Sequence, residues 1–357
     1  RTLHAALAHA GADASEPSLT LVLADGTYDE ALTLTRSVVV QGGGSDRVTI
    51  RNPAPMDGSF VITADGDHDP AHPIRVELRG LRVDGWKGTH PGIEAKHATL
   101  VLSNVEVYQP SGTGVRIGED IADFAITDTR VGFEGELNSD LGIDVGSHSS
   151  GTITRFHGGD HIDHIIDIGL GCHVTIRDSE LTGSPIYYAD GVRIQGASDV
   201  TVENTQIVRP PGGQAASSGP AHNPPYAGIE IAASSDEQAR VHVNGCTVRG
   251  FDVGVGINLT YNAVNVEHST LAGNVSADVR TLWAGALVEQ YPSVDLGGGA
   301  LGSAGDNDFG NGSELAIDHG APYDVSALND RWGVTGSAID ARIHDASDDA
   351  QLGHVLY

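Results

Sequence analysis

The sequence is poor in several residue types on which other classes of protein depend. Aromatic residues make up 5% of the 357 positions, the only lysines are Lys87 and Lys96, and the only cysteines are Cys172 and Cys246. No run of 18 apolar residues occurs, so the sequence predicts no membrane-spanning helix. The two cysteines fall several repeats apart, and we therefore expect two buried thiols rather than a disulfide.

Positive charge is also scarce. The chain has 48 acidic residues against 20 lysines and arginines, which gives a formal net charge of −28. Nucleic acids are bound through Lys and Arg at their phosphates, so this balance argues against a nucleic-acid partner. It argues equally against an anionic membrane surface. A net charge of this size keeps a protein soluble and favours a monomer.

Glycine and short apolar runs are what the sequence has in abundance. There are 47 glycines, and brief stretches of Val, Ile, Leu and Thr alternate with Gly, Asn, Asp or Pro. This texture is typical of an all-β protein with many short strands. Only the segment Thr2–Ala10 has the pattern of a helix.

A repeat runs through most of the chain. Its first mark is a triplet with apolar outer residues, and successive triplets begin 22 to 37 residues apart. Because side chains of a strand alternate between its two faces, the outer residues face a core and the middle residue faces outward. The triplets are Ile93-Glu94-Ala95, Val115-Arg116-Ile117, Ile143-Asp144-Val145, Ile166-Asp167-Ile168, Val192-Arg193-Ile194, Ile229-Glu230-Ile231 and Val255-Gly256-Ile257.

A second motif keeps phase with the triplets. It is an apolar-x-apolar strand, two corner residues and another short strand, as in Leu100-Val101-Leu102 followed by Val105 and Val107. The second corner residue is a type that tolerates a positive φ angle, or in one case histidine. These predicted corner residues are Gly80, Asn104, Asp128, Asp178, Asn204, Gly245 and His268.

Together the two motifs predict an all-β fold, a right-handed parallel β-helix with three short strands per rung. We expect one domain over residues 1–357: a capping helix over 1–10, rungs over 19–286, and irregular C-terminal rungs with a cap over 287–357. No rung buries its apolar face alone, so stability comes from stacking. A β-sandwich is the rival fold, but its strands do not recur in a fixed three-strand phase.

The rungs resemble the repeat of the pectin-lyase-like superfamily. The opening Leu21–Tyr28 (LVLADGTY) with Val38–Gly42, and later Asn307–Phe309 with Asn329–Gly333, are similar to the first and last turns of its members. The superfamily includes polysaccharide lyases, polygalacturonase-type hydrolases, epimerases and surface proteins of unknown function. No family's catalytic signature is complete in this sequence, so the resemblance implies the fold and transfers no catalytic residue.

The outward middle residues form a predicted column, in which Asp144 and Asp167 occupy neighbouring rungs about 5 Å apart. Two carboxylates at that distance repel one another. Arg116 and Arg193 flank the pair, and acids beside arginines suit chemistry on an extended sugar chain. The alternative is a structural charge ladder, in which cross-strand ion pairs stabilise the sheet slightly.

The loops beside this column carry histidines, tyrosines and further acids, and we assign candidate roles on that basis. The candidate catalytic residues are Asp144, Asp167, Arg193, His164 and Tyr188. The candidate substrate-binding residues are Arg116, Glu230, Asp190, Tyr226 and His161. The candidate metal ligands are Asp140 and Asp163, whose carboxylate oxygens suit Ca²⁺.

Two functions remain open. The first is an enzyme that cleaves an extended polysaccharide in a groove along one sheet, as a lyase or as a glycoside hydrolase with acids near the retaining distance. The second is a non-catalytic surface or carbohydrate-binding protein, which the scarcity of aromatic stacking rings favours slightly. We expect a secreted or cell-surface location. No signal peptide is visible, and we expect that one has been removed.

Overall fold

The computed structural model describes most of the chain. The described residues are 2–10, 19–54, 58–66, 73–85, 89–132, 139–159, 161–185, 189–196, 198–211, 226–232, 238–258, 262–282, 293–310 and 312–357. The chain divides into two compact units, Arg1–Asp167 and Ile168–Tyr357, and each is described by itself. The expectation of one domain over the whole chain stays a prediction.

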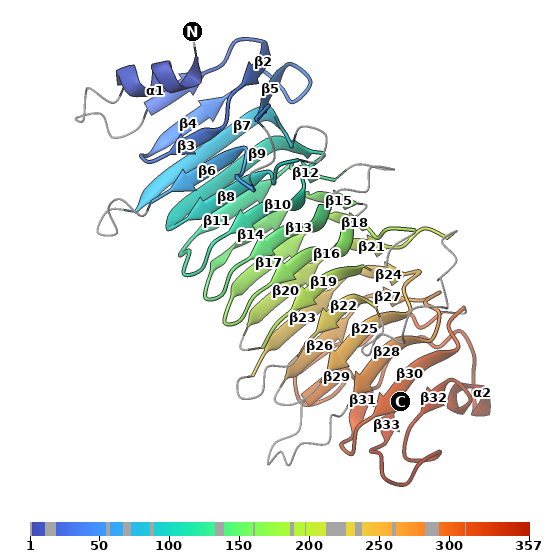
Figure 1. The fold of residues 1–357 in the computed structure, drawn as a ribbon. Coiled ribbons are helices and arrows are strands. Elements are labelled where there is room, and N and C mark those ends of the chain that lie inside the picture. Colours follow the sequence, from blue (N-terminus) through green and yellow to red (C-terminus); the bar gives the residue numbers. More distant parts are fainter. Residues whose placement is uncertain are drawn as a thin grey trace. The chain divides into compact units, whose positions relative to one another are not determined.

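The first unit begins with helix α1 (Leu3–Ala10) and continues as two sheets of parallel strands (Figure 1). One sheet contains β3 (Leu32–Leu34), β6 (Ile62–Asp65), β8 (Ile93–Lys96), β10 (Gly112–Ile117), β13 (Ser139–Val145) and β16 (His161–Ile168). The other contains β1 (Leu19–Val22), β2 (Gly26–Asp29), β4 (Val38–Gln41), β5 (Val48–Arg51), β7 (Ile74–Asp84), β9 (Ala98–Tyr108), β11 (Phe124–Thr127), β12 (Arg130–Val131), β14 (Ser150–Thr154) and β15 (His157–Gly159).

The second unit repeats this arrangement and adds the short helix α2 (Ser337–Asp340). One sheet contains β19 (Asp190–Ile194), β22 (Ala227–Ile231), β25 (Val253–Asn258), β28 (Ala277–Leu282), β30 (Leu315–Gly320) and β32 (Ile343–His344). The other contains β17 (His173–Arg177), β18 (Glu180–Thr182), β20 (Asp199–Glu203), β21 (Gln206–Val208), β23 (Arg240–Asn244), β24 (Thr247–Arg249), β26 (Ala263–Glu267), β27 (Thr270–Leu271), β29 (Ser293–Gly297), β31 (Val325–Ala327) and β33 (Val355–Leu356).

Both units are parallel β-solenoids, which confirms the predicted all-β parallel β-helix with an N-terminal helix. The alternation read from the sequence holds in the triplets: Val115 and Ile117 are completely buried, while Arg116 between them is partly exposed. Stacked apolar residues of this kind form the interior of each unit. In the described part of the chain, no helix has the length and apolar character needed to cross a bilayer.

The predicted corners adopt the expected backbone conformation. A positive φ angle occurs at all seven of the positions predicted for it, with values from 48° at Asn204 to 65° at Gly245. His268 has φ of 52° despite its bulk. Arg155, which sequence reasoning did not select, holds the equivalent position between β14 and β15 with φ of 48°. One left-handed residue per rung therefore turns the chain from one short strand into the next.

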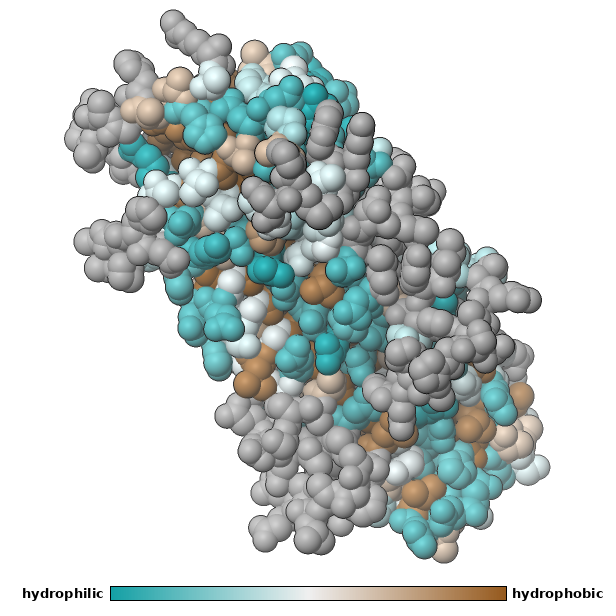
Figure 2. All heavy atoms as spheres, in the orientation of Figure 1, coloured by the Kyte–Doolittle hydropathy of each residue, from teal (hydrophilic) through white to brown (hydrophobic). Residues whose placement is uncertain are grey.

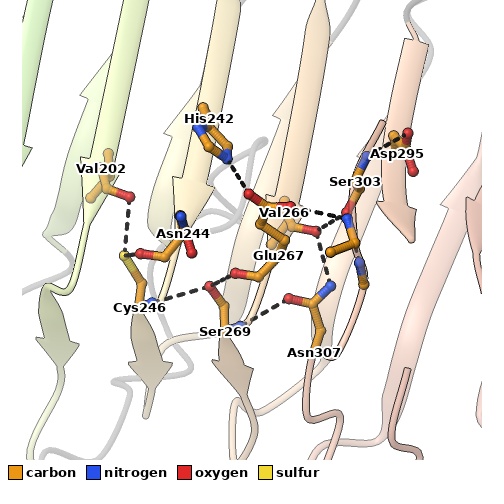
Figure 3. A network of polar contacts seen from close by, with 12 residues as sticks. Val202, His242, Asn244, Cys246, Val266, Glu267, Ser269, Asp295, Ser303 and Asn307 are labelled. Atoms are coloured by element: carbon orange, nitrogen blue, oxygen red, sulfur yellow. Dashed lines mark hydrogen bonds and ion pairs between the residues drawn. The ribbon is translucent and has the colours of Figure 1, made fainter. Parts of the chain in front are cut away.

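A ladder of buried polar side chains follows the inner side of these corners in the second unit (Figure 3). The amide of Cys246 donates to Ser269 Oγ at 3.1 Å, the amide of Ser269 to Asn307 Oδ1 at 3.0 Å, and the amide of Asn307 to Asp330 Oδ1 at 2.8 Å. Each rung thus satisfies an amide of the rung before it, which a buried backbone requires.

Both cysteines are free and buried, as predicted. Burial raises the pKa of the Cys246 thiol to about 11, so the thiol stays protonated at neutral pH. Cys246 Sγ lies 3.3 Å from the carbonyl oxygen of Val202 and therefore takes part in the polar ladder as a donor.

Single side chains hold the ends of the two units. In the first, Glu30 accepts hydrogen bonds from the amides of Leu3 (2.5 Å) and His4 (3.1 Å), which satisfies free N–H groups at the start of α1. In the second, the guanidinium of Arg342 donates to the carbonyl oxygens of Phe309 at 2.5 Å, Trp332 at 2.6 Å and Gly310 at 2.7 Å. Arg342 thus joins two backbone segments near the C-terminus, one at Phe309 and Gly310 and the other at Trp332.

Candidate functional site

The predicted column is formed in the first unit by strand register. Arg116 on β10 pairs with Glu94 on β8 on one side and with Asp144 on β13 on the other. Asp167 lies on β16, the next strand of the same sheet, within the same buried-outward-buried pattern as Asp144. We call Glu94, Arg116, Asp144 and Asp167 the acidic stripe.

Arg116 is the centre of the contacts within the acidic stripe. Its Nε donates to Asp144 Oδ2 at 3.0 Å, and its Nη1 lies 4.0 Å from Glu94 Oε1. The guanidinium carbon also lies 5.4 Å from the centroid of the Phe60 ring, a cation–π distance. The Asp144 side chain remains 25% exposed, so a ligand can reach it beside its arginine partner.

Not every member of the predicted column faces solvent as expected. Glu94 is only 9% exposed and Glu230 only 7%, since neighbouring side chains cover them. Lys96 Nζ lies 3.1 Å from Glu94 Oε2, and Asn258 Nδ2 donates to Glu230 Oε1 at 3.1 Å. These two acids are held by protein groups, which is the arrangement expected of a structural charge ladder.

A histidine–carboxylate contact lies on β16, close to Asp167 in the chain. His164 is 7% exposed, and its Nε2 lies 3.2 Å from Oδ1 of Asp163, whose side chain is 61% exposed. A carboxylate in this position orients an imidazole ring. Asp140 on β13 is exposed. Among the described residues, no group of three or more His, Cys, Asp or Glu side chains is arranged to hold a metal ion, and the expected Ca²⁺ site at Asp140 and Asp163 stays a prediction.

Five predicted residues belong to the second unit, and four of them are described. Arg193 pairs in register with Glu230, and its Nε lies 3.5 Å from Glu230 Oε2. Asp190 is 4% exposed, and its Oδ1 accepts a hydrogen bond from the amide of Ala227 at 2.6 Å, which is a structural contact. Tyr226 directly precedes β22 and is partly exposed. Tyr188 lies outside the described residues, as does the side chain of His161.

The outward column of the second unit extends further than the sequence indicated. Register carries it from Gly256 to Arg280 on β28, Asp318 on β30 and His344 on β32. Asp318 accepts from Arg280 Nε at 2.7 Å and lies 3.0 Å from His344 Nδ1. The sequence did contain the pattern that predicts this extension, since Val279-Arg280-Thr281 and Ile317-Asp318-His319 nearly match the triplet with apolar outer residues. The intervening glycine-rich segment obscured their phase.

Figure 2 shows hydrophilic residues over much of the visible face, with apolar residues between them. The positions of the candidate residues do not test their predicted roles in catalysis, substrate binding or metal binding. The roles stay predictions, and only the geometry described for each residue is established.

Solved structures similar to this chain are parallel β-helix proteins, which confirms the resemblance to the pectin-lyase-like superfamily at the level of the fold. The A-module of the mannuronan C-5 epimerase AlgE6 of Azotobacter vinelandii has 16% identity and a TM-score of 0.55, covering 92% of this chain and 93% of that one. The catalytic domain of a GH87 alpha-1,3-glucanase variant in complex with nigerose has 13% identity and a TM-score of 0.62, covering 100% of this chain and 66% of that one. The Dettilon tailspike protein has 14% identity and a TM-score of 0.50, covering 99% and 64%.

The chain thus spans about two thirds of the length of the tailspike and glucanase chains that it matches. None of the curated proteins matches it in sequence. Within the class of parallel β-helix proteins, the chain belongs to the DUF1565 family, described as a protein of unknown function. The family's sequence profile matches residues 134–336, more than half of the chain.

Proposed function

We propose that this protein acts on an extended polysaccharide that lies along the acidic stripe of the first unit. The observation that carries the proposal is the register that sets Arg116 between two carboxylates on successive strands, with Asp167 on the strand after Asp144. Neighbouring strands lie about 4.8 Å apart, so a sugar chain crossing them meets one outward side chain per strand.

The chemistry of the stripe fits two reactions on sugars. In a hydrolase, Asp144 and Asp167 divide the roles of general acid and nucleophile or base. In a lyase, His164 removes the C5 proton of a uronate residue, the Arg116 guanidinium binds the uronate carboxylate, and a neighbouring acid protonates the leaving oxygen. The Asp163–His164 contact at 3.2 Å supports His164 as an oriented base.

The similar structures support the polysaccharide part of the proposal. A mannuronan epimerase module and a glucanase bound to nigerose share this fold. We infer an extracellular, secreted or cell-surface location, because extended polysaccharides of this kind lie outside the cell. We also infer a monomer, because the net charge of −28 opposes self-association.

A second function is favoured by the pairing of the charges themselves. Glu94 contacts both Lys96 and Arg116, and Arg116 in turn holds Asp144. A ladder in which Glu94, Arg116 and Asp144 are paired with one another suits a non-catalytic surface or carbohydrate-binding protein as well as an enzyme. Binding without turnover is the property that separates this candidate from the first.

The decisive experiment is a screen of the full chain against uronate and neutral polysaccharides. Reducing ends report hydrolysis and the absorbance of unsaturated products reports elimination. We expect Asp144→Asn and Asp167→Asn each to lower turnover by about a hundredfold or more, because each removes a proton-transfer or nucleophilic group. We expect thermal midpoints within a few degrees of wild type, since both acids lie on the surface of the sheet.

The matched control is Asp123→Asn. Its side chain is 67% exposed in the same unit and lies 4.0 Å from Arg75, outside the acidic stripe. Turnover should be unchanged in this variant. Full activity in both stripe variants would remove the stripe from the mechanism, whereas saturable polysaccharide binding with no product would establish the second function. Repeating the assay with EDTA tests whether Ca²⁺ takes part.

A further inference from the structure

A pocket lies on the other parallel sheet of the first unit, away from the acidic stripe. Its volume is about 290 Å³, close to the lower limit for small-molecule sites. It is lined mainly by polar side chains. Those that the argument uses are Ser45, Asn104, Glu106, Asp128, Arg130 and His157.

Strand register and two corners build the pocket. Arg130 on β12 pairs with Glu106 on β9 and with His157 on β15, so these three side chains form one outward column. Asn104 and Asp128 are the positive-φ corners of two of these rungs, with φ of 54° and 50°. Corner amides and carboxylates therefore lie beside the column.

The remaining wall comes from an earlier rung. Ser45 belongs to the loop between β4 and β5, whose Gly44 amide donates to the carbonyl oxygen of Gly80 at 2.8 Å. That contact ties the loop to the corner of the next rung. Ser45 thus lines the same pocket as residues about 60 to 110 positions later in the chain.

The two acids of the pocket are already neutralised by arginines that do not line it. Glu106 Oε2 accepts from Arg82 Nε at 3.0 Å, and Arg82 Nη2 lies 2.9 Å from the same oxygen. Asp128 accepts two hydrogen bonds from Arg155, at 2.6 and 2.8 Å. The hydrogen bond from Arg155 lowers the pKa of Asp128, with a further contribution from the nearby His157.

Arg130 is different. It is exposed, and within the described part of the chain its guanidinium forms no ion pair or hydrogen bond. With Glu106 and Asp128 each matched to its own arginine, Arg130 is the uncompensated charge of the pocket. In a chain with a net charge of −28, a small polar pocket with positive charge is suited to an anionic ligand.

We propose that this pocket binds one uronic acid residue, with the sugar carboxylate on Arg130 and the ring hydroxyls hydrogen-bonded to Asn104, Ser45 and His157. A planar guanidinium matches a carboxylate through two parallel hydrogen bonds. The volume suits a single sugar ring rather than a long segment. The proposal rests on the proposed function only in taking a polysaccharide as the ligand, and it adds a binding site separate from the acidic stripe.

The test is a calorimetric titration of the full chain with a short oligouronate and with a neutral oligosaccharide of the same length. We expect Arg130→Gln to weaken binding of the oligouronate about tenfold or more, because a charge-assisted pair is lost. Any binding of the neutral oligosaccharide to the acidic stripe should be unchanged in this variant. Arg240→Gln is the matched control. Arg240 is an exposed strand arginine that also forms no side-chain ion pair with the described residues, and its loss should leave the affinity unchanged.

Three outcomes would overturn the proposal: equal oligouronate affinity in Arg130→Gln and wild type, an equal loss of neutral-oligosaccharide binding in Arg130→Gln, or displacement of the oligouronate by inorganic phosphate at the same concentration. The last result would identify a general anion site. The proposed function fails separately, because turnover tests the acidic stripe. Asp144→Asn should retain oligouronate binding at the pocket even where turnover is lost.

Discussion

At the scale of single residues, burial raises the pKa of two acids of the second unit, Asp278 and Asp330, more than their polar contacts lower it. Asp278 is completely buried, and burial raises the pKa of its carboxyl to about 6 although Ser313 and Asn274 donate hydrogen bonds to it. Arg342 Nη2 lies 3.7 Å from Asp278 Oδ2. Burial likewise raises the pKa of Asp330 to about 7.

The pH dependence of stability should reveal Asp278. The folded state binds its proton more tightly than the unfolded state, so protonation contributes stability that is present below pH 3.8 and lost as the pH rises through about 6. A difference of about two pKa units corresponds to on the order of 3 kcal/mol. We expect wild type to lose roughly this much more stability than Asp278→Asn between about pH 4 and pH 7.

Urea unfolding at several pH values measures this difference. Asp199→Asn is the control, because Asp199 is an exposed strand aspartate of the same unit. Its pH profile should match that of wild type. Identical pH slopes for wild type and Asp278→Asn would show that the buried carboxyl does not titrate in this range.

At the scale of the element, the corner between two short strands is the feature that every rung repeats. Gly245 has φ of 65°, and a Cβ atom added there would lie 2.7 Å from Asn204 Oδ1 in the preceding rung. Gly273 also has a positive φ, 74°, but an added Cβ would meet nothing within 4 Å. The two glycines therefore separate the cost of a left-handed backbone from the cost of crowding between rungs.

We expect Gly273→Ala to lower the free energy of unfolding by about 1 kcal/mol, the cost of a left-handed alanine. Gly245→Ala should cost about 1 kcal/mol more, because the Asn204 side chain must also move. Urea unfolding of both variants measures the difference. Equal losses would mean that Asn204 gives way freely and that neighbouring corners do not constrain one another.

At the scale of the whole molecule, the net charge of −28 is the dominant electrostatic feature. Repulsion among like charges destabilises a compact state, and salt reduces it. The screening length falls from about 30 Å at 0.01 M salt to about 3 Å at 1 M. We expect the thermal midpoint to rise by several degrees over that range of NaCl, as measured by circular dichroism.

The same titration tests the calcium prediction for Asp140 and Asp163. A midpoint higher in CaCl₂ than in NaCl at equal ionic strength would support a bound cation, and Asp140→Asn and Asp163→Asn should then remove the excess. Equal midpoints in the two salts would argue against calcium at these residues.

For the NaCl prediction itself, a thermal midpoint that falls as NaCl rises would contradict it. That result would show that the surface ion pairs stabilise the fold more than the like-charge repulsion destabilises it.

The fold was predictable from the sequence to a greater depth than the site. The triplet around Arg116 and the corner at Asn104 were each read correctly, because alternation and a positive φ are properties of a few consecutive residues. The burial of Glu94 and the hydrogen bonds of Cys246 in the polar ladder were not predicted from the sequence, because both depend on residues of neighbouring rungs. The pocket beside Arg130 gave no signal in the sequence.

The sequence by itself determined the coil of short strands, because hydrophobic alternation and left-handed corner residues act locally and recur in every rung. Only the tertiary structure decided which charges meet. Arg130 follows Glu106 by 24 residues and His157 follows Arg130 by 27, and the three become neighbours only through the register of β9, β12 and β15. The stacking of the rungs decides whether an arginine pairs with a carboxylate of the protein or stays available to a ligand. No local sequence pattern encodes that stacking.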